Sequence, residues 1–581
     1  MHPRRRLLKR IGAGLGLVGS SVLLSKITPP IYAQSTPIEI EPGSFVSPAD
    51  YIVFKENGEY YARNGKTGVI EFGPSDDATT IIQSVLDALT PGRTWKETVL
   101  LKGVFECRYI SGDACITIPS YTRLILNGVL KLADGQDKRL ITTETGGAYI
   151  DLLGGVFDGN KDNQTPGTEQ SLVRIYSSSY VTVQGIIVRN AIWKGLHIVG
   201  REYESDCYNI NVSNVIAHNN GSAGVDVTGE NAHDINLNNI VSYNNPAGSG
   251  ITIGDGYKIN INNAILWKNA KGIVVDRGYD ININNVVMSE HNTTGIRLTD
   301  AGTGEYPYRI KLSNCYSYMD GLNGFDTLAA KDCSFMNCVA YKPAEDGFNL
   351  DADTERIKLV NCKAIECGGD GFDISGSKIS LLNCSAYKNQ QTGFRITGRY
   401  IDVISCFGIN NNQVGGLNHG LVLNDAMYCK VIACLFADYQ TTPTQKYGII
   451  EKNAADYNII MFNRCEGNVT KDYEIIGANT IVRYNQGYRT ENHGMVTLTG
   501  DGSTKEFVAK VEHGLVSDKV AVSVSCTKPT TAPPSYIYGY LSDENNDDFK
   551  ETIVITVKFD TAPASGEQFD IYWRAEVIQS S

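Results

Sequence analysis

Short segments in which apolar and polar residues alternate recur along most of this chain. The clearest copies are NCYSYMDGLNGFDTL, NCVAYKPAEDGFNLD, NCKAIECGGDGFDIS and NCSAYKNQQTGFRIT, between residues 314 and 397. In each copy a glycine opens a strand, and successive side chains of a strand point to opposite faces. The pattern predicts an apolar file on the inside, formed by Phe325, Phe348, Phe372 and Phe394. A polar file on the outside would contain Asp326, Asn349, Asp373 and Arg395.

The same glycine-led strand extends well beyond these four copies. Its repeat of roughly 22 to 29 residues is typical of a solenoid. The glycines are Gly195, Gly224, Gly250, Gly272, Gly295, Gly324, Gly347, Gly371, Gly393, Gly420 and Gly448. A second apolar segment in each repeat ends at an asparagine, which tolerates the left-handed backbone of a sharp bend. These residues, which predict an asparagine ladder along the axis, are Asn214, Asn239, Asn263, Asn285, Asn314, Asn337, Asn361 and Asn383.

Three short strands per coil with an asparagine ladder resemble the right-handed parallel β-helix of the pectate-lyase superfamily. The resemblance covers about Val99 to Tyr488. It implies an all-β right-handed parallel β-helix, which we assign to residues 98–489.

The first 97 residues predict an export signal followed by a cap. Residues 1–33 contain a twin-arginine run before a short apolar stretch and resemble a twin-arginine signal peptide, so we expect a secreted or cell-surface protein. Within residues 34–97, Asn57-Gly58 is a hairpin turn signal. A short amphipathic helix follows, capped near Asp77 and ended by Pro91-Gly92. An open solenoid end needs such a cover.

The coil pattern ends near residue 490. Residues 490–581 show alternating strands separated by Gly- and Pro-rich turns, which predict a C-terminal β-sandwich domain. Attachment, carbohydrate binding, trimerisation and capping all remain open for this domain.

Cysteine usage and charge narrow the possible partners. Of the 14 cysteines, most fall in small apolar core positions of the coil, and only Cys107 and Cys115 are candidates for a disulfide. No cysteine or histidine spacing typical of a zinc site is present. A net charge of −12 argues against nucleic acid as a partner.

Candidate chemistry gathers on the glycine-led strands. The residue before each glycine, and the residues two and four after it, are expected to face solvent. Five carboxylates would then lie within three coils, flanked by Arg297 and Arg395; they are Asp326, Asp346, Asp351, Asp370 and Asp373. Such a cluster repels itself unless it holds a cation or protons, and its hard oxygen donors suit Ca²⁺. A solvated acidic face is the simpler alternative.

Aromatic residues form a second outward row on the third strand of the coil. Tyrosine rings stack on sugars, but they also stack on one another in solenoids. Tyr318, Tyr341 and Tyr387, together with Asn349, are the candidate substrate-binding residues.

Two coils resemble the calcium loop of family 9 pectate lyases. The segments are Glu345-Asp346-Gly347-Phe348-Asn349 and Gly369-Asp370-Gly371-Phe372-Asp373. Thr392–Gly398 is similar to the segment that carries the catalytic lysine of that family, with Arg395 in its place. The resemblance implies Ca²⁺-dependent β-elimination of a uronic-acid-containing polysaccharide, with Asp326, Asp346, Asp370 and Asp373 as ligands. Arg395 would serve as base or carboxylate clamp, and Arg297 is a second catalytic candidate.

Two other functions remain open. Glycoside hydrolases of this fold use paired carboxylates; Asp346 with Asp370 on adjacent coils, or Asp326 with Asp373, would give such pairs. A non-catalytic adhesin or a surface or virion fibre would use the solenoid as a rod. We therefore expect an exported protein that engages an acidic polysaccharide.

Overall fold

The fold is seen in a computed structural model that describes residues 48–578 except 167–169, 201–204, 518, 531–532 and 545–548. The predicted signal at residues 1–33 lies outside the described residues. Among the residues described, no helix has the length and apolar character needed to cross a membrane.

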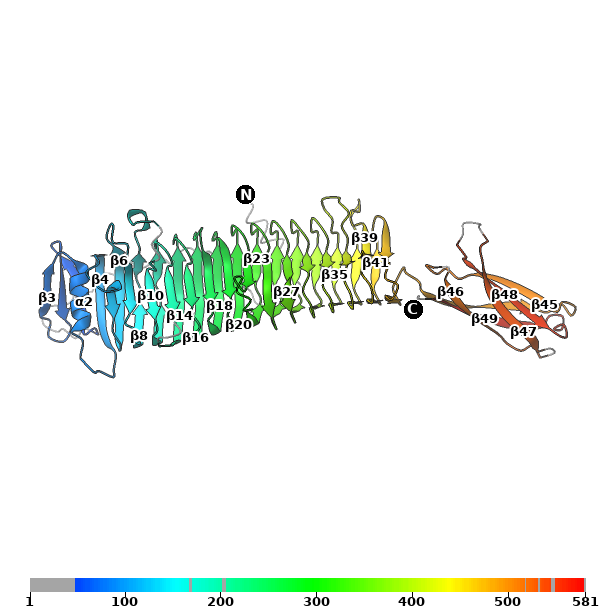
Figure 1. Cartoon of the computed structure of the whole chain (residues 1–581), viewed down its shortest axis with the longest axis horizontal. Coiled ribbons are helices and arrows are strands. Elements are labelled where there is room, and N and C mark those ends of the chain that lie inside the picture. The colour runs from blue at the N-terminus through cyan, green and yellow to red at the C-terminus, as the bar shows by residue number, and fades with distance from the viewer. Residues whose placement is uncertain are drawn as a thin grey trace. The chain divides into compact units, whose positions relative to one another are not determined.

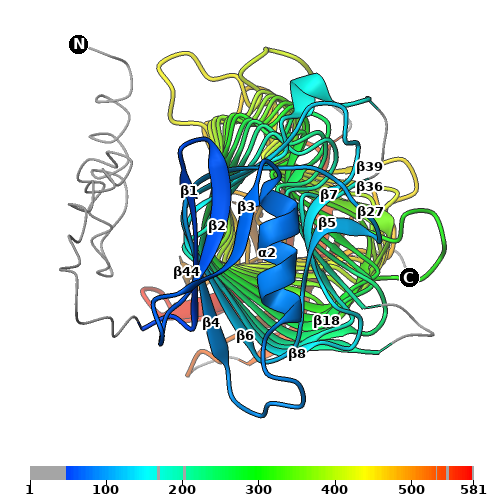
Figure 2. The same cartoon turned by 90° about the vertical axis from the view of Figure 1, so that its left-hand side faces the viewer.

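A hairpin and a helix begin the described chain. β1 (Tyr51–Glu56) pairs with β2 (Glu59–Asn64), which pairs in turn with β3 (Ile70–Ser75). Asn57 and Gly58 both have positive φ, as a two-residue turn between twisted strands requires. The Asp77 side chain accepts from two backbone N–H groups and caps α2 (Ala78–Asp87). In Figure 2 α2 lies across the end of the coils, and its buried Ile82 and Val85 join their core.

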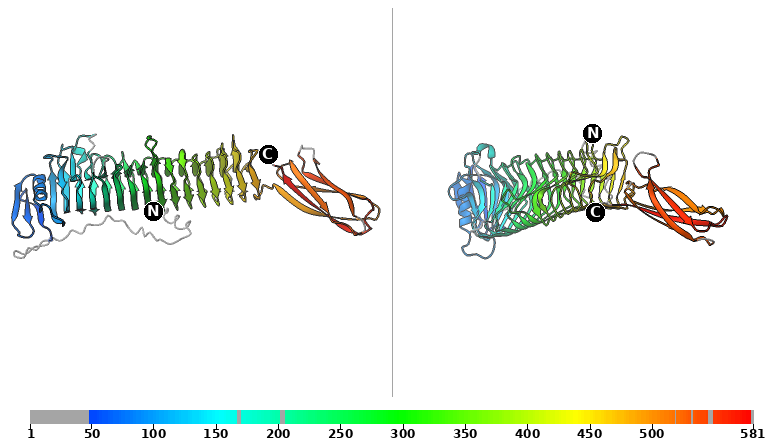
Figure 3. Two further views of the ribbon diagram at one scale, coloured as in Figure 1. Left: turned by 60° about the horizontal axis from the view of Figure 1, so that its bottom comes forward. Right: turned by 45° about the vertical axis from the view of Figure 1, so that its right-hand side comes forward.

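The solenoid has three faces of parallel strands stacked along one axis (Figures 1 and 3). The face formed by the glycine-led strands is called the glycine sheet. Its strands are β5 (Ala114–Ile118), β7 (Arg139–Thr143), β10 (Val173–Tyr176), β13 (Leu196–Val199), β15 (Val225–Thr228), β17 (Ser249–Gly254), β19 (Lys271–Asp276), β21 (Ile296–Thr299), β24 (Phe325–Lys331), β27 (Phe348–Glu355), β30 (Phe372–Ile374), β33 (Phe394–Ile396), β36 (Leu421–Asn424), β39 (Tyr447–Lys452) and β42 (Lys471–Glu474).

The second face carries the strands that lead into the asparagine bends and is called the asparagine sheet. Its strands are β4 (Glu97–Cys107), β6 (Thr122–Leu132), β8 (Ala148–Leu153), β11 (Ser179–Gln184), β14 (Cys207–His218), β16 (Ala232–Tyr243), β18 (Tyr257–Trp267), β20 (Tyr279–Ser289), β22 (Tyr308–Ser313), β25 (Ser334–Met336), β28 (Lys358–Val360), β31 (Ser380–Leu382), β34 (Asp402–Ile404), β37 (Lys430–Ile432), β40 (Ile459–Met461) and β43 (Ile481–Arg483).

The third sheet follows each bend. It contains β9 (Val156–Asp158), β12 (Ile187–Arg189), the second halves of β14, β16, β18 and β20, and then β23 (Tyr316–Tyr318), β26 (Val339–Tyr341), β29 (Lys363–Ile365), β32 (Ser385–Tyr387), β35 (Phe407–Ile409), β38 (Leu435–Ala437) and β41 (Arg464–Glu466). A short 3₁₀ helix at Lys161–Asn163 interrupts an early coil.

The two predicted files are present, the phenylalanines inside the core and the asparagines on the surface at the bends. Phe325, Phe348, Phe372 and Phe394 are fully buried, and their ring centroids stack 4.6–4.8 Å apart. All eight predicted bend asparagines have φ between 53° and 56°. Their amides hydrogen-bond from coil to coil, for example Asn361 Nδ2 to Asn337 Oδ1 at 3.2 Å. Because successive coils repeat these contacts, strand register is fixed along this part of the axis.

The cysteines also follow the prediction. Cys315, Cys338, Cys362, Cys384, Cys406, Cys434 and Cys465 are buried in the solenoid core as free thiols. Cys107 and Cys115 are likewise buried and free rather than paired. Burial in a medium of low polarity raises the pKa of the Cys107 thiol.

Replacing Cys362 by valine is expected to change the free energy of unfolding by less than about 1.5 kcal/mol, because the equivalent core position holds valine at 215 and 286. Cys362→Asp should cost several times more, since it buries an unpaired charge. Denaturant unfolding followed by circular dichroism measures both. A large loss in Cys362→Val would mean that the thiol itself is needed.

The C-terminal part forms two three-stranded antiparallel sheets. One contains β44 (Glu491–Thr499), β49 (Gln568–Val577) and β46 (Val520–Cys526); the other contains β45 (Glu506–Glu512), β48 (Thr552–Phe559) and β47 (Pro534–Ser542). Apolar residues of both sheets, among them Ile555, Val557, Ile571 and Phe569, share one core. This is the predicted β-sandwich.

Candidate functional site

The predicted outward polar file lies on the glycine sheet. Parallel pairing of β21, β24, β27, β30 and β33 brings Arg297, Asp326, Asn349, Asp373 and Arg395 into one register. Neighbouring strands are about 4.8 Å apart, so the two arginines are separated by about 19 Å along the axis. The acidic residues of the file lie between them.

Asp326 is held by amides and by Arg297. Its Oδ1 accepts from Asn323 Nδ2 at 3.1 Å and from Asn349 Nδ2 at 3.0 Å. Arg297 Nε lies 3.6 Å from its Oδ2. Asn349 also donates to Asp351 Oδ1 at 3.1 Å. Asn349 therefore links two carboxylates on neighbouring coils.

The residues before the glycines form a second, partly buried ladder. The backbone N–H of Asp346 donates to Asn323 Oδ1 at 3.0 Å, that of Asp370 to Asp346 Oδ1 at 2.6 Å, and that of Thr392 to Asp370 Oδ1 at 2.6 Å. One oxygen of Asp346 and one of Asp370 therefore hold adjacent coils together.

The expectation that this outer row faces solvent is wrong for two of the five predicted carboxylates. Asp370 is 3% exposed and Asp326 is 5% exposed. Asp370 is drawn in by the backbone amide of the next coil, and Asp326 is covered by the side chains that hydrogen-bond to it. The other three predicted carboxylates, those of Asp346, Asp351 and Asp373, are half-buried.

Burial and mutual repulsion disfavour ionisation of these carboxyl groups. Burial, and then the charge of Asp370, raise the pKa of Asp346 to about 7. Burial and Asp373 raise the pKa of Asp370 to about 6. Burial also raises the pKa of Asp373 and that of Asp351. Arg395, 3.7 Å from Asp370 Oδ2, offsets part of this effect.

The carboxylates of the acidic file provide some, but not all, of what a Ca²⁺ site requires. Carboxylate oxygens are suitable hard ligands, and Asp373 Oδ1 is buried without a hydrogen-bond partner. In the part of the chain that the structure describes, however, no three Asp, Glu, His or Cys side chains are grouped closely enough to share a metal ion. Any Ca²⁺ bound here would therefore take at most two of these carboxylates and would depend on amide, water or substrate oxygens for the rest of its shell.

The aromatic candidates are not brought to the acidic cluster. Tyr318 and Tyr341 stack on each other, with centroids 5.7 Å apart, on the third sheet. Tyr387 is 37% exposed and is separated from Tyr341 by Ile365 in the register. These tyrosines and the acidic file belong to different faces of the coil.

Two lysines near the ends of the acidic file were missed. Burial, and then Arg297, lower the pKa of Lys271. Burial, and then Arg395, lower the pKa of Lys452, whose Nζ lies 2.8 Å from His419 Nε2. Lys271 precedes Gly272, and Lys452 comes four residues after Gly448. The outward positions already identified from the sequence contain both residues.

A second polar cluster was also missed, several coils nearer the N-terminus on the same sheet. Lys194 Nζ lies 2.9 Å and His197 Nε2 lies 3.2 Å from Asp226 Oδ1. Burial lowers the pKa of His197, so the ring is neutral near pH 7. His197 and Asp226 are each two residues after a repeat glycine. The same positional rule would have found them.

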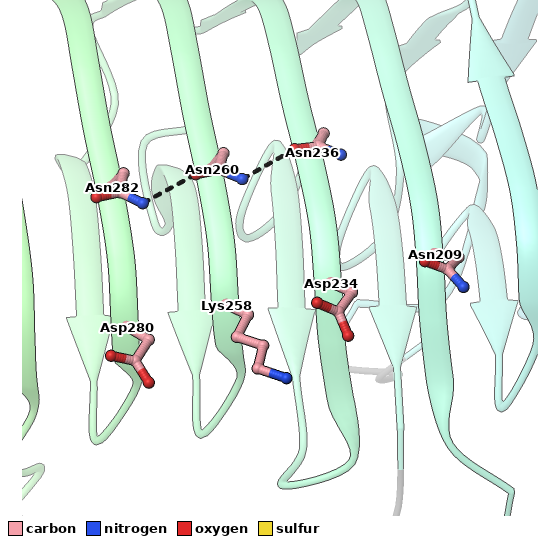
Figure 4. Close-up of a pocket in the computed structure, with 7 residues that line it drawn as sticks. All are labelled: Asn209, Asp234, Asn236, Lys258, Asn260, Asp280 and Asn282. Carbon is pink, nitrogen blue, oxygen red and sulfur yellow. Dashed lines mark hydrogen bonds between the residues drawn. The ribbon is translucent and has the colours of Figure 1, made fainter.

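A shallow groove of about 440 Å³ lies on the asparagine sheet rather than at the acidic cluster (Figure 4). Asn236, Asn260 and Asn282 line it and hydrogen-bond in a row at 3.0–3.1 Å, starting from Asn211. These amides are engaged in stacking the coils. We therefore place the candidate site at the acidic file, where burial raises the pKa of Asp346, Asp370 and Asp373.

Comparisons with known proteins agree with this architecture. Residues 271–436 match a family model described as a right handed beta helix region. No curated protein sequence matches the chain significantly.

Solved structures extend the likeness to most of the chain. A mutant tailspike protein of E. coli bacteriophage HK620, in complex with a pentasaccharide, has 10% identity and a TM-score of 0.50, covering 89% of this chain and 92% of its own. The A-module of mannuronan C-5 epimerase AlgE4 from Azotobacter vinelandii has 17% identity and a TM-score of 0.36, covering 70% and 96%. At such identities the likeness concerns the fold alone. The solenoid of this chain is a right-handed parallel β-helix.

Proposed function

We propose that the acidic file of the glycine sheet binds and cleaves an acidic polysaccharide by β-elimination. The supporting observation is the partly desolvated group Asp346, Asp370 and Asp373, with Arg297 and Arg395 at its two ends. A uronate carboxylate placed there needs cationic partners, which the arginines supply. The twin-arginine-type sequence at residues 1–33 supports export to where such polymers occur.

Residue roles follow from charge and exposure. Arg395, whose side chain is 46% exposed, clamps the uronate carboxylate, because a guanidinium keeps its charge and makes a poor base. Lys452, with its lowered pKa, is the better candidate to accept the C5 proton. Asp370 and Asp373 would hold Ca²⁺, with Asp346, Asp326 and Asp351 in support. When bound, the ion supplies positive charge that acidifies that proton.

Hydrolysis is the second candidate, and a specific observation favours it. With a pKa of about 7, Asp346 is protonated in a large share of the molecules near neutral pH, as a glycosidase general acid must be. A second carboxyl group one or two coils away, such as that of Asp326, would complete the pair. The two mechanisms differ in product, because only elimination creates a C=C bond.

Calcium titration calorimetry combined with product analysis tests the proposal. Wild type should bind Ca²⁺ saturably and release product that absorbs in the ultraviolet from polygalacturonate or alginate, and the double variant Asp370→Ala/Asp373→Ala should do neither. New reducing ends without ultraviolet absorbance would select hydrolysis. Absence of both calcium binding and cleavage would reject an enzymatic role for this cluster.

A further inference from the structure

Three tyrosines form a row on the C-terminal sandwich. Tyr536, Tyr538 and Tyr540 alternate along β47 with residues that face the core, among them Ile537 and Leu541. They are 45%, 46% and 50% exposed. Among the strands that the structure describes, β47 pairs with β48 alone, so it is an edge strand of its sheet. Three half-exposed aromatic rings on one strand are more than scattered surface apolarity.

These rings are spaced more widely than the tightest tyrosine stacks of the solenoid, and about as widely as Tyr318 and Tyr341, whose centroids are 5.7 Å apart. Tyr257 and Tyr279 stack with centroids 4.9 Å apart and planes within 1°, so each ring covers a face of its neighbour. Along β47 the centroids are 5.8 and 6.3 Å apart, with planes tilted by 18° and 19°. Alternate residues of one strand are about 6.8 Å apart. The wider spacing leaves more ring surface open to a ligand.

The row is electrically neutral. Pro534–Ser542 (PSYIYGYLS) contains no charged residue. Each lysine beside it has an acidic partner: Lys558 lies 3.7 Å from Glu506 and 5.8 Å from the ring centroid of Tyr536, and Lys510 lies 2.9 Å from Glu544. Val508, 53% exposed, lies in the same register row as Tyr538. The patch therefore offers aromatic rings, phenolic hydroxyls and an aliphatic side chain without net charge.

We propose that this row binds a neutral polysaccharide, with successive sugar rings packed against Tyr536, Tyr538 and Tyr540. Sugars present C–H faces for aromatic rings and hydroxyl groups that exchange hydrogen bonds with phenols, which matches a tyrosine's apolar body and polar tip. Because each flanking lysine has an acidic partner, the patch carries no net positive charge to favour a uronate, and the ligand class is neutral. This binding is independent of cleavage at the glycine sheet, and it anchors the chain on a glycan surface.

An edge strand could instead pair with a second copy of the chain. Pro534 at the first position of β47 limits such pairing, because proline lacks the N–H that a ladder needs. Pairing of β47 with another protein chain, in place of sugar binding, would overturn the proposal.

The proposal is tested by measuring retention of the full chain on microcrystalline cellulose and on chitin. Soluble polygalacturonate is the acidic comparison. Wild type should be retained on at least one neutral polymer. Tyr538→Ala should bind that polymer about tenfold more weakly, and Tyr538→Trp should bind it with the same strength as wild type. Tyr572→Ala is the matched control, since Tyr572 is 45% exposed on the other sheet. Circular dichroism and sedimentation check folding and mass.

Equal retention of wild type and Tyr538→Ala would overturn the proposal, as would retention of neither on a neutral polymer. A change of oligomeric state in Tyr538→Ala without any loss of sugar binding would assign the row to a second copy of the chain. Cleavage of a uronan should be unaffected in Tyr538→Ala, so a failure here is separable from a failure of the proposed enzyme site.

Discussion

Replacing Arg395 by alanine is expected to lower kcat/KM on a uronan by about 100- to 1000-fold, the usual effect of removing one group that stabilises developing charge. Arg395 ends the acidic file, beside Asp373 in the register and 3.7 Å from Asp370. Without it, a uronate carboxylate would approach a group of raised-pKa carboxyls with no cation at that end. The initial rate of ultraviolet-absorbing product measures the effect.

Arg399→Ala is the matched control for this experiment. Arg399 is exposed in the same coil but lies outside the file, so its loss should change the rate less than about twofold, as for surface substitutions generally. Arg395→Lys should fall between wild type and alanine, because lysine keeps the charge but loses the planar fork. Equal rates for Arg395→Ala and Arg399→Ala would contradict the assigned role.

The second large effect concerns pH and stability. In metal-free buffer, Asp370→Asn is expected to stabilise the protein at pH 8 by roughly 1–3 kcal/mol and to be close to neutral at pH 4. In the unfolded chain the pKa of this carboxyl group is about 3.9. In the folded chain, burial and the charge of Asp373 raise its pKa to about 6. Between these two pKa values the folded state binds a proton that the unfolded state has released. Wild-type stability therefore falls as pH rises through this window.

Asparagine removes this dependence and keeps the structural contact. Its side-chain oxygen still accepts the Thr392 N–H that Asp370 accepts at 2.6 Å. Thermal and denaturant unfolding at pH 4, 6 and 8 measure the difference. If Asp370→Asn were less stable than wild type at pH 8 in the absence of metal, the carboxyl would be compensated by groups other than those described.

Asp332 gives a control of opposite sign. Hydrogen bonds from Arg356, at 2.7 and 3.0 Å, lower its pKa. Its contribution to stability is present above the unfolded pKa and is lost in acid, so Asp332→Asn should lose stability at neutral pH rather than gain it.

Added Ca²⁺ should raise the stability of wild type at pH 8 and leave that of Asp370→Asn less affected, if Asp370 is a ligand.

The repeat sequence determined the solenoid, its inward phenylalanines and its asparagine bends. These follow from features that recur from coil to coil: alternation along a strand, a glycine that opens it, and, in eight of the coils, an asparagine with positive φ that ends the next strand. It also placed Asp326, Asn349, Asp373 and Arg395 in one file, because register in stacked coils copies the sequence alignment of the repeats. Applied to every coil, the same rule would have found Lys271, Lys452, His197 and Asp226.

Only the tertiary structure decided which of these polar groups are buried and what they contact. One carboxylate oxygen of Asp346 and one of Asp370 accept a hydrogen bond from a backbone N–H of the next coil, whereas Asp373 Oδ1 has no hydrogen-bond partner. Tyr318 and Tyr341 face a different side of the coil from the acids, whereas Tyr538 lies open on the sandwich. Alternation gives the side of a strand on which a residue lies, but solvent exposure and charge compensation depend on neighbours more than 20 residues away, which the periodicity of one strand does not encode.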